Sequence, residues 1–206
     1  MNIKTKLVAV LLSSVCLGAM AQTTISVTSA QSPTSFATLA GTFNPVGVNL
    51  TNLFTTYGSS FVKNATVSFA DTSPVKFTFV GKEAGNTNGF GLGVVDTIGN
   101  LVLLNTSTPG STVMTSVLNG DFSFFFYDLT TGTPVSNPSF AIGVAQGADK
   151  SKALFVFNDN GSGDGDYDDM VVSVTSVPES ETYAMMLAGL GMIGTIARRR
   201  NKAKAA

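Results

Sequence analysis

The sequence predicts an all-β fold, an antiparallel β-sandwich or jelly-roll-like domain, followed by a C-terminal transmembrane helix. Short runs of β-branched and aromatic residues recur through residues 22–176, separated by Gly, Pro, Asn and Asp, which is typical of strands joined by turns. No segment in that interval shows a helical period, whereas a parallel α/β sheet would need crossover helices. The transmembrane helix is predicted from an uncharged run near the C-terminus that precedes a cluster of positive charge.

Residues 1–21 have the pattern of a cleaved secretion signal. Lys4 and Lys6 give a charged start, Leu7–Leu17 supplies a mostly apolar run, and Ala19-Met20-Ala21 places small residues at the cleavage site. We therefore expect signal peptidase to cleave after Ala21. An N-terminal membrane anchor is the alternative, but a membrane span needs about 20 apolar residues, and this run is shorter.

Residues 22–176 have the length of one domain, since domains usually hold roughly 100 to 200 residues. The only cysteine, Cys16, lies in the secretion signal, so disulfides do not stabilise the exported domain. The domain contains five lysines, no arginine and eleven acidic residues, which leaves a net charge of −6. Because phosphate binding needs clustered Lys and Arg, this charge argues against a nucleic-acid partner. A cation or a polar carbohydrate fits better.

The strands of this domain are predicted from alternation and from β-forming composition. The expected strands are Thr23–Ser29, Val62–Phe69, Val75–Val80, Leu101–Leu104, Thr112–Leu118, Phe122–Tyr127, Ser139–Ala145, Ala153–Phe157 and Met170–Val174. The run Phe122–Tyr127 is apolar on both faces, which indicates a central strand that is covered on each side. A platform for stacking sugars is the alternative interpretation of this run, and the absence of tryptophan weakens it.

One acidic segment carries the pattern of a metal site. Residues 158–169 contain several carboxylates and glycines between two expected strands, and the candidate ligands are Asp159, Asp164, Asp166, Asp168 and Asp169. Neighbouring carboxylates repel one another, and a hard cation that binds their oxygens relieves this repulsion, so Ca²⁺ is the expected ion. The spacing does not fit an EF-hand, because Asp169 stands where Gly is required and Thr175 where Glu is required. A solvated hairpin loop and a loop that docks a partner remain alternatives.

The same segment resembles a motif of an uncharacterised β domain found in exported bacterial proteins. The resemblance rests on Phe155-Val156-Phe157-Asn158-Asp159 and on Gly163-Asp164-Gly165-Asp166-Tyr167-Asp168-Asp169 with the apolar residues after it. The pattern often has Glu or Asp where this chain has Asn158, and Asn where it has Asp168. Each exchange keeps an oxygen ligand but changes its charge. The resemblance implies no activity.

The last thirty residues form a tail of three parts. Val177-Pro178-Glu179 is followed by the uncharged run 182–197 and then by Arg198, Arg199 and Arg200. The tail resembles the PEP-CTERM sorting signal of Gram-negative bacteria, with Ser180 in place of the second proline of that motif. The resemblance implies recognition by an exosortase, cleavage near Pro178 and Glu179, and a link to exopolysaccharide and biofilm production. A simple tail anchor is the alternative.

These features predict an exported protein that is not an enzyme. The chain has no histidine, which excludes Ser-His-Asp and Cys-His catalysis and the usual zinc sites, and the glycine-rich stretch 81–93 lacks the phosphate-binding spacing. We expect a membrane-anchored precursor that becomes a protein of the cell surface or of the exopolysaccharide matrix, with exosortase and signal peptidase as partners. A carbohydrate-binding or adhesion module is the alternative. A polysaccharide hydrolase that uses paired carboxylates is the third hypothesis.

Overall fold

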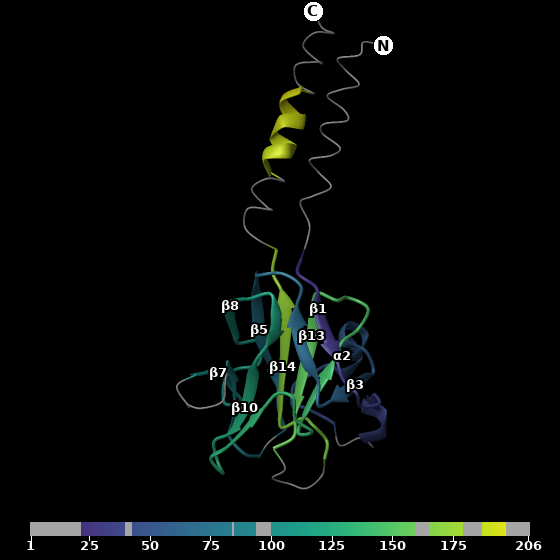
Figure 1. The fold of residues 1–206 in the computed structure, drawn as a ribbon, viewed down its shortest axis with the longest axis vertical. Helices are drawn as coiled ribbons and strands as arrows, with labels where there is room; N and C mark the ends of the chain where they lie inside the picture. Colours follow the sequence, from purple (N-terminus) through teal and green to yellow (C-terminus); the bar gives the residue numbers. More distant parts are fainter. Residues whose placement is uncertain are drawn as a thin grey trace, which may run out of the picture. The chain divides into compact units, whose positions relative to one another are not determined.

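The computed structural model describes residues 22–39, 43–83, 85–93, 100–159, 165–178 and 187–196. Thr23–Val177 forms one unit, which is the β domain (Figure 1). Its helices are η1 (Phe36–Leu39) and α2 (Leu50–Tyr57). Its strands are β1 (Ile25–Thr28), β2 (Thr34–Ser35), β3 (Ser60–Lys63), β4 (Thr66–Phe69), β5 (Ser73–Gly81), β6 (Asn88–Leu92), β7 (Leu101–Leu104), β8 (Thr112–Val117), β9 (Gly120–Phe122), β10 (Phe124–Asp128), β11 (Thr133–Ser136), β12 (Ile142–Ala145), β13 (Lys152–Phe157) and β14 (Met170–Ser176).

The described strands are arranged in three sheets. The largest has the order β2-β3-β12-β13-β14-β5-β8, the second β11-β10-β6-β7, and the third β1-β4-β9. Every pair of neighbouring strands in these sheets is antiparallel. The described part of the domain is therefore mostly β with antiparallel sheets, which confirms the antiparallel β prediction at this level.

All three sheets contribute to one main hydrophobic core. The first sheet supplies Phe77, Phe155 and Val172, the second Phe90 and Phe124, and the third Ile25 and Val67. The phenylalanine rings pack closely, and the centroids of Phe124 and Phe155 lie 4.3 Å apart in a stacked arrangement. Because aromatic rings bury large apolar areas, this core supplies most of the hydrophobic stabilisation without disulfides.

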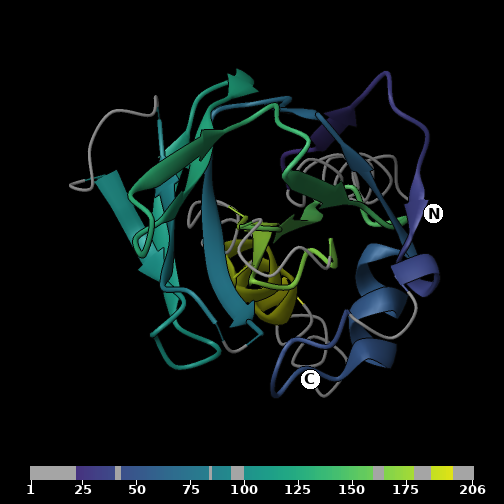
Figure 2. The same cartoon turned by 90° about the horizontal axis from the view of Figure 1, so that it is seen from below.

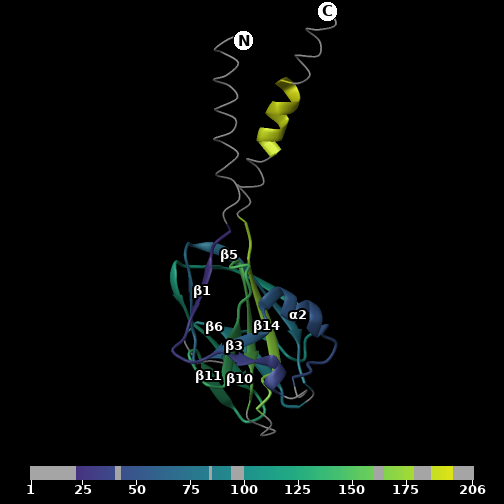
Figure 3. The ribbon, with the colours of Figure 1, turned by 90° about the vertical axis from the view of Figure 1, so that its right-hand side faces the viewer.

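A second core covers the other face of the largest sheet. Its members include Phe36 of η1, Leu53 of α2, and Leu154 and Val156 of β13. Seen from below, η1 and α2, in blue, lie away from the strands of the second sheet (Figure 2). In the side view, α2 and β1 lie at opposite sides of the domain (Figure 3). Since β13 sends alternate residues into the two cores, its apolar run is continuous instead of alternating.

The aromatic run at 122–127 lies in the core, as the sequence predicts. Phe124, Phe125 and Phe126 are fully buried in β10, which lies between β11 and β6. The ring of Phe125 covers Gly91 of β6, where an added Cβ atom would come within 2.2 Å of the ring. Burial of these three rings removes them from any exposed sugar-stacking platform, whereas Phe122 and Tyr127 are partly exposed. The strand is nevertheless shorter than expected, because Ser123 separates β9 from β10.

The prediction that the domain contains no helix is wrong. The side chain of Asn49 accepts a hydrogen bond from the backbone N–H of Asn52 at the start of α2, and Gly58 ends the helix with a φ of 89°. A helix of eight residues is too short to show a clear period, and only Leu53 is buried. The expected strand Val62–Phe69 is also wrong as a single element, because the chain turns at Asn64, which has a φ of 51°.

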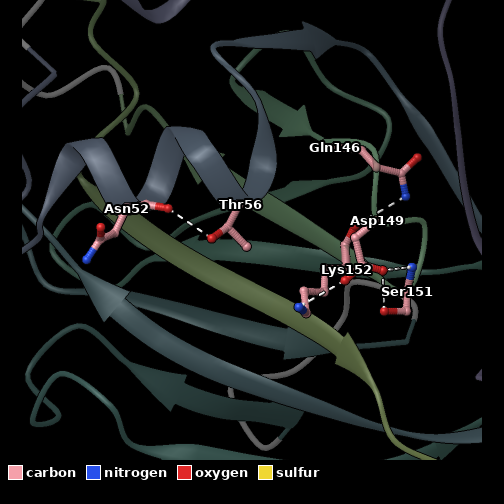
Figure 4. A network of polar contacts seen from close by, with 6 residues as sticks. All are labelled: Asn52, Thr56, Gln146, Asp149, Ser151 and Lys152. Carbon is pink, nitrogen blue, oxygen red and sulfur yellow. Dashed lines mark hydrogen bonds and ion pairs between the residues drawn. The ribbon is translucent and has the colours of Figure 1, made fainter.

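A polar turn joins β12 to β13 (Figure 4). It lies at the end of this hairpin opposite the acidic segment that follows β13. The carboxylate of Asp149 accepts hydrogen bonds from the hydroxyl and the backbone N–H of Ser151, and it forms an ion pair of 2.9 Å with Lys152. The Ser151 hydroxyl is the largest cause that lowers the pKa of Asp149 to about 2. Gln146 donates from its side chain to the carbonyl of Lys152. This turn is therefore fixed by local polar contacts.

Candidate functional site

Strand pairing brings residues that are distant in sequence to the acidic segment. β14 pairs with β5 so that Val171 lies opposite Gly81. The residues after β5 therefore lie beside the residues before β14, and the backbone N–H of Glu83 donates to the carbonyl of Asp168 over 2.7 Å. The start of β14 is at the lower end of the domain in Figure 1, opposite the end where β14 leads into the tail.

A third segment completes this junction. The backbone N–H of Val46 donates to the carbonyl of Lys82 over 2.7 Å, so residues 44–46 run beside the residues after β5. The backbone N–H of Asn44 donates to Oδ2 of Asp168. We call this meeting point of residues 44–46, 82–83 and 165–169 the acidic junction.

Three carboxylates converge at the acidic junction. One carboxylate oxygen from each of Glu83, Asp166 and Asp168 lies within 4.8 Å of the other two. Asp166 is 2 % exposed, Asp168 is fully buried and Glu83 is partly exposed. Among the described residues, this is the group of acidic side chains whose geometry suits a metal ion.

The environment of Asp168 disfavours its charged form. The pKa of this carboxyl is raised from 3.8 to about 7, mainly by burial. The N–H of Asn44 opposes this rise, and the charges of Asp166 and Glu83 contribute to it. Oδ1 of Asp168 is buried and accepts no hydrogen bond. A carboxylate in such a place is stabilised by a proton or by a cation.

Tyr167 holds the two aspartates in place. Its φ of 67° lies in the left-handed region, which costs a non-glycine residue roughly 1–2 kcal/mol. The side chain offsets this cost, because its ring packs 4.9 Å from that of Phe61 in the second core and its hydroxyl donates to the carbonyl of Phe140. Lys63 adds a cation–π contact at 4.8 Å from the ring centroid. The tyrosine between the aspartates thus anchors the loop on the sheet.

Two other aspartates of the segment lie in a separate hydrogen-bonded group. Oδ2 of Asp169 accepts from the backbone N–H of Asp159 over 2.8 Å, and Oδ2 of Asp159 accepts from the side chain of Asn88 over 2.8 Å. The side chains of Asn88 and Asn105 both approach the carbonyl of Asp169. These contacts bind the acidic segment to β6 and to the end of β7.

The structure therefore divides the five predicted metal ligands. Asp166 and Asp168 meet at the acidic junction, Asp159 and Asp169 belong to the neighbouring hydrogen-bonded group, and Asp164 lies outside the described residues. Glu83 was missed, although it follows the predicted strand Val75–Val80 by three residues. Only the pairing of that strand with the one after the acidic segment could have pointed to it.

The processing residues are described only in part. The backbone N–H of Val177 donates to the carbonyl of Pro74 over 2.9 Å, so the chain is still bound to β5 at this residue. Pro178 follows it and is partly buried. Ala21, Glu179 and the arginines Arg198, Arg199 and Arg200 lie outside the described residues.

The tail is helical over residues 187–196. The predicted span 182–197 extends beyond this part on both sides. In the residues that the structure describes, no helix has the length and apolar character needed to cross a membrane.

Comparison with known families concerns the tail. Residues 176–201 match the family model of the PEP-CTERM protein-sorting motif. The chain carries this sorting motif. The motif indicates an exported protein with a C-terminal sorting signal, and it implies an exosortase as the processing partner. A comparison with curated proteins finds no match to the chain.

Proposed function

We propose that the chain is an exported, non-enzymatic protein whose β domain is delivered by an exosortase to the cell surface or the exopolysaccharide matrix. The PEP-CTERM sorting motif carries this proposal, because it begins at Ser176, the last residue of β14. Cleavage near Pro178 and Glu179 would leave both cores of the domain intact, since every member of the cores precedes Val177. The released product would be the folded β domain.

In the proposed precursor, the tail holds the domain at the membrane until processing. Residues 182–197 would cross the bilayer, and Arg198, Arg199 and Arg200 would remain on the cytoplasmic side, where positive charge is favoured. Arginine side chains beside a short span can extend toward the lipid headgroups. Signal peptidase would remove residues 1–21 at the other end of the chain.

Two observations favour a non-enzymatic role over the alternatives. Three rings of the aromatic run that could have stacked sugars, those of Phe124, Phe125 and Phe126, are fully buried, which lowers the support for a carbohydrate-binding surface built on them. No acidic side chain lines any of three hollows on the described surface, the largest of which lies beside α2. A hydrolase with paired carboxylates would place such groups on opposite walls of a cleft.

Processing is tested by expressing the full chain in a host with and without an exosortase gene. We expect a C-terminus near residue 178 only in the host that has the enzyme, as measured by mass spectrometry of the terminal peptide. Pro178→Ala combined with Glu179→Ala should abolish the product, Thr182→Ala should not, and Ser180→Pro should increase it. The same terminal peptide in both hosts would overturn the proposed route.

The non-enzymatic role needs a separate measurement. The purified chain is applied to a glycan array and incubated with extracted exopolysaccharide. We expect no reproducible binding to a defined sugar and no release of oligosaccharides. Selective binding would instead establish the carbohydrate-binding alternative, and turnover that Asp166→Asn abolishes would establish the hydrolase.

A further inference from the structure

We propose that the acidic junction is a Ca²⁺ site in which Glu83, Asp166 and Asp168 supply carboxylate ligands. This inference goes beyond the sorting function, and it moves the expected site from the loop alone to a junction of three segments. It assigns a ligand role to Glu83, a residue that lies more than eighty positions before its partners.

The geometry of Asp168 provides the second observation that points to a ligand. The side chain is fully buried, its Oδ2 atom is fixed by the N–H of Asn44, and its Oδ1 atom has no hydrogen-bond donor. A buried carboxylate oxygen without a donor costs free energy unless a cation or a proton reaches it. The raised pKa of Asp168 has the same physical origin.

The coordination chemistry of the two ions favours calcium over magnesium. Mg²⁺ needs a near-ideal octahedral geometry and releases its waters reluctantly, whereas Ca²⁺ tolerates an irregular set of oxygen ligands. The three carboxylates already have one oxygen each within 4.8 Å of the others. Ca²⁺ also accepts bidentate carboxylates and water in a coordination shell of about 6–8 oxygens. The junction therefore suits Ca²⁺ with little rearrangement of its backbone.

A bound cation would strengthen the connection between segments that already meet through backbone hydrogen bonds. Asn44 and Glu83 each make one backbone hydrogen bond to Asp168. A Ca²⁺ ion shared by carboxylates from both sides would add direct links between the residues after β5 and those before β14. We therefore expect the ion to order this end of the domain and to raise its resistance to unfolding.

The site is tested with the full chain in mild detergent and with CaCl₂ alone as the ligand. We expect isothermal titration calorimetry to give a Kd on the order of 10⁻⁴–10⁻³ M, as in other extracellular calcium modules. A Ca²⁺ concentration tenfold above the Kd should raise the Tm by about 3–6 °C relative to chelator. MgCl₂ at the same concentration should raise it by less.

Variants of the junction carboxylates test whether Ca²⁺ binds at the acidic junction or elsewhere in the acidic segment 158–169. Glu83→Gln and Asp166→Asn should each weaken Ca²⁺ binding by at least about tenfold, because the charge of the ligands determines affinity. Asp121→Asn, which changes an exposed carboxylate on β9, should bind as the wild type does. The partly exposed position of Glu83 makes its variant the safer one for folding, which circular dichroism in chelator verifies.

Two results would overturn the proposal. One is the absence of any calcium-dependent heat or Tm shift in the folded wild-type chain. The other is a Glu83→Gln variant that keeps wild-type affinity while Asp159→Asn loses it, since this would place the ion in the neighbouring group. Neither result affects the sorting route, because the junction lies at the end of β14 opposite Val177, roughly 20 Å away for a strand of this length.

Discussion

Replacement of Asp168 by asparagine should remove a contribution that makes the cation-free domain less stable as the pH rises. The raised pKa of this carboxyl, about 7 against an ordinary 3.8, means that the folded domain retains a proton here which the unfolded chain has already released. In the pH range between these two values, the free energy of unfolding therefore falls as the pH rises. Asparagine at position 168 carries no titrating group, so the variant should lack this contribution.

The magnitude follows from the proton linkage of one group. A single bound proton changes the free energy of unfolding by up to about 1.4 kcal/mol for each pH unit, so a rise from pH 5 to pH 6.5 should destabilise the chelated wild type by roughly 2 kcal/mol. At pH 7 without cations, Asp168→Asn should be the more stable protein, by about 1–3 kcal/mol. With saturating Ca²⁺ the order should reverse, because only the wild type keeps the full ligand set.

Urea unfolding in chelator at several pH values measures this difference. The wild type, Asp168→Asn and the control Asp121→Asn are compared at constant ionic strength, so that the slopes of other carboxylates cancel. We expect the control to follow the wild type. A wild-type stability that stays level or rises between pH 5 and pH 6.5, relative to Asp168→Asn, would refute the reasoning on burial and repulsion at the junction.

Three further predictions concern packing, the anchor of the loop and the polar turn. Gly91→Ala should destabilise the domain by about 1–3 kcal/mol in urea unfolding, because its methyl group would overlap a buried ring, whereas Gly85→Ala, which meets open space, should have little effect. Tyr167→Phe should cost about 1 kcal/mol by the same assay, because the ring stays and one hydrogen bond is lost; an unchanged stability would contradict that bond. The lowered pKa of Asp149 adds stability above pH 3.8 that disappears as the pH falls toward 2. Between these pH values Asp149→Asn should therefore lose less stability than the wild type. The difference between the two losses should be under about 1 kcal/mol, because this site is exposed.

Strands with a strong local pattern could be predicted from the sequence. β5 alternates buried and partly exposed residues along its whole length, and β13 is apolar on both faces because a core lies on each side. β6, in contrast, has the sequence Asn-Gly-Phe-Gly-Leu, whose glycines disfavour a strand by composition. Its glycines are explained only by its neighbours, since the side chains of Leu101 and Phe125 occupy the space where Cβ atoms would lie.

The short helix α2 also could not be predicted from its local sequence. α2 contains three threonines and buries a single leucine, so neither helix propensity nor hydrophobic period favours it strongly. The capping residue Asn49 can be recognised in the local sequence. The packing of the helix in one core with Leu154 and Val156 depends on tertiary structure and cannot be recognised there. An eight-residue helix is marginal in isolation. Packing on the outer face of the largest sheet stabilises it here.

Prediction of the acidic site needs both the local sequence pattern and the pairing of distant strands. The density of carboxylates in residues 158–169 predicted a cation site with Asp159, Asp164, Asp166, Asp168 and Asp169 as ligands, because repulsion between close neighbours can be read along the chain. The role of Glu83 depends on the pairing of β5 with β14, which is a contact of high sequence separation. The local pattern therefore indicated where acidic side chains gather, and the sheet topology determined which of them converge.

The expected affinity of the proposed Ca²⁺ site agrees with the export that the sorting signal indicates. A Kd on the order of 10⁻⁴–10⁻³ M is typical of extracellular calcium modules, whereas cytosolic calcium sensors bind with a Kd of about 10⁻⁷–10⁻⁵ M. A site of three carboxylates with the weaker affinity would be filled at extracellular calcium levels and empty in the cytosol. Before export the junction would hold its acidic side chains without a cation to stabilise their charged forms, which weakens the folded state of the chain. After export, binding to the folded state alone would add stability. The calcium site would therefore make the folded domain more stable outside the cell than before translocation.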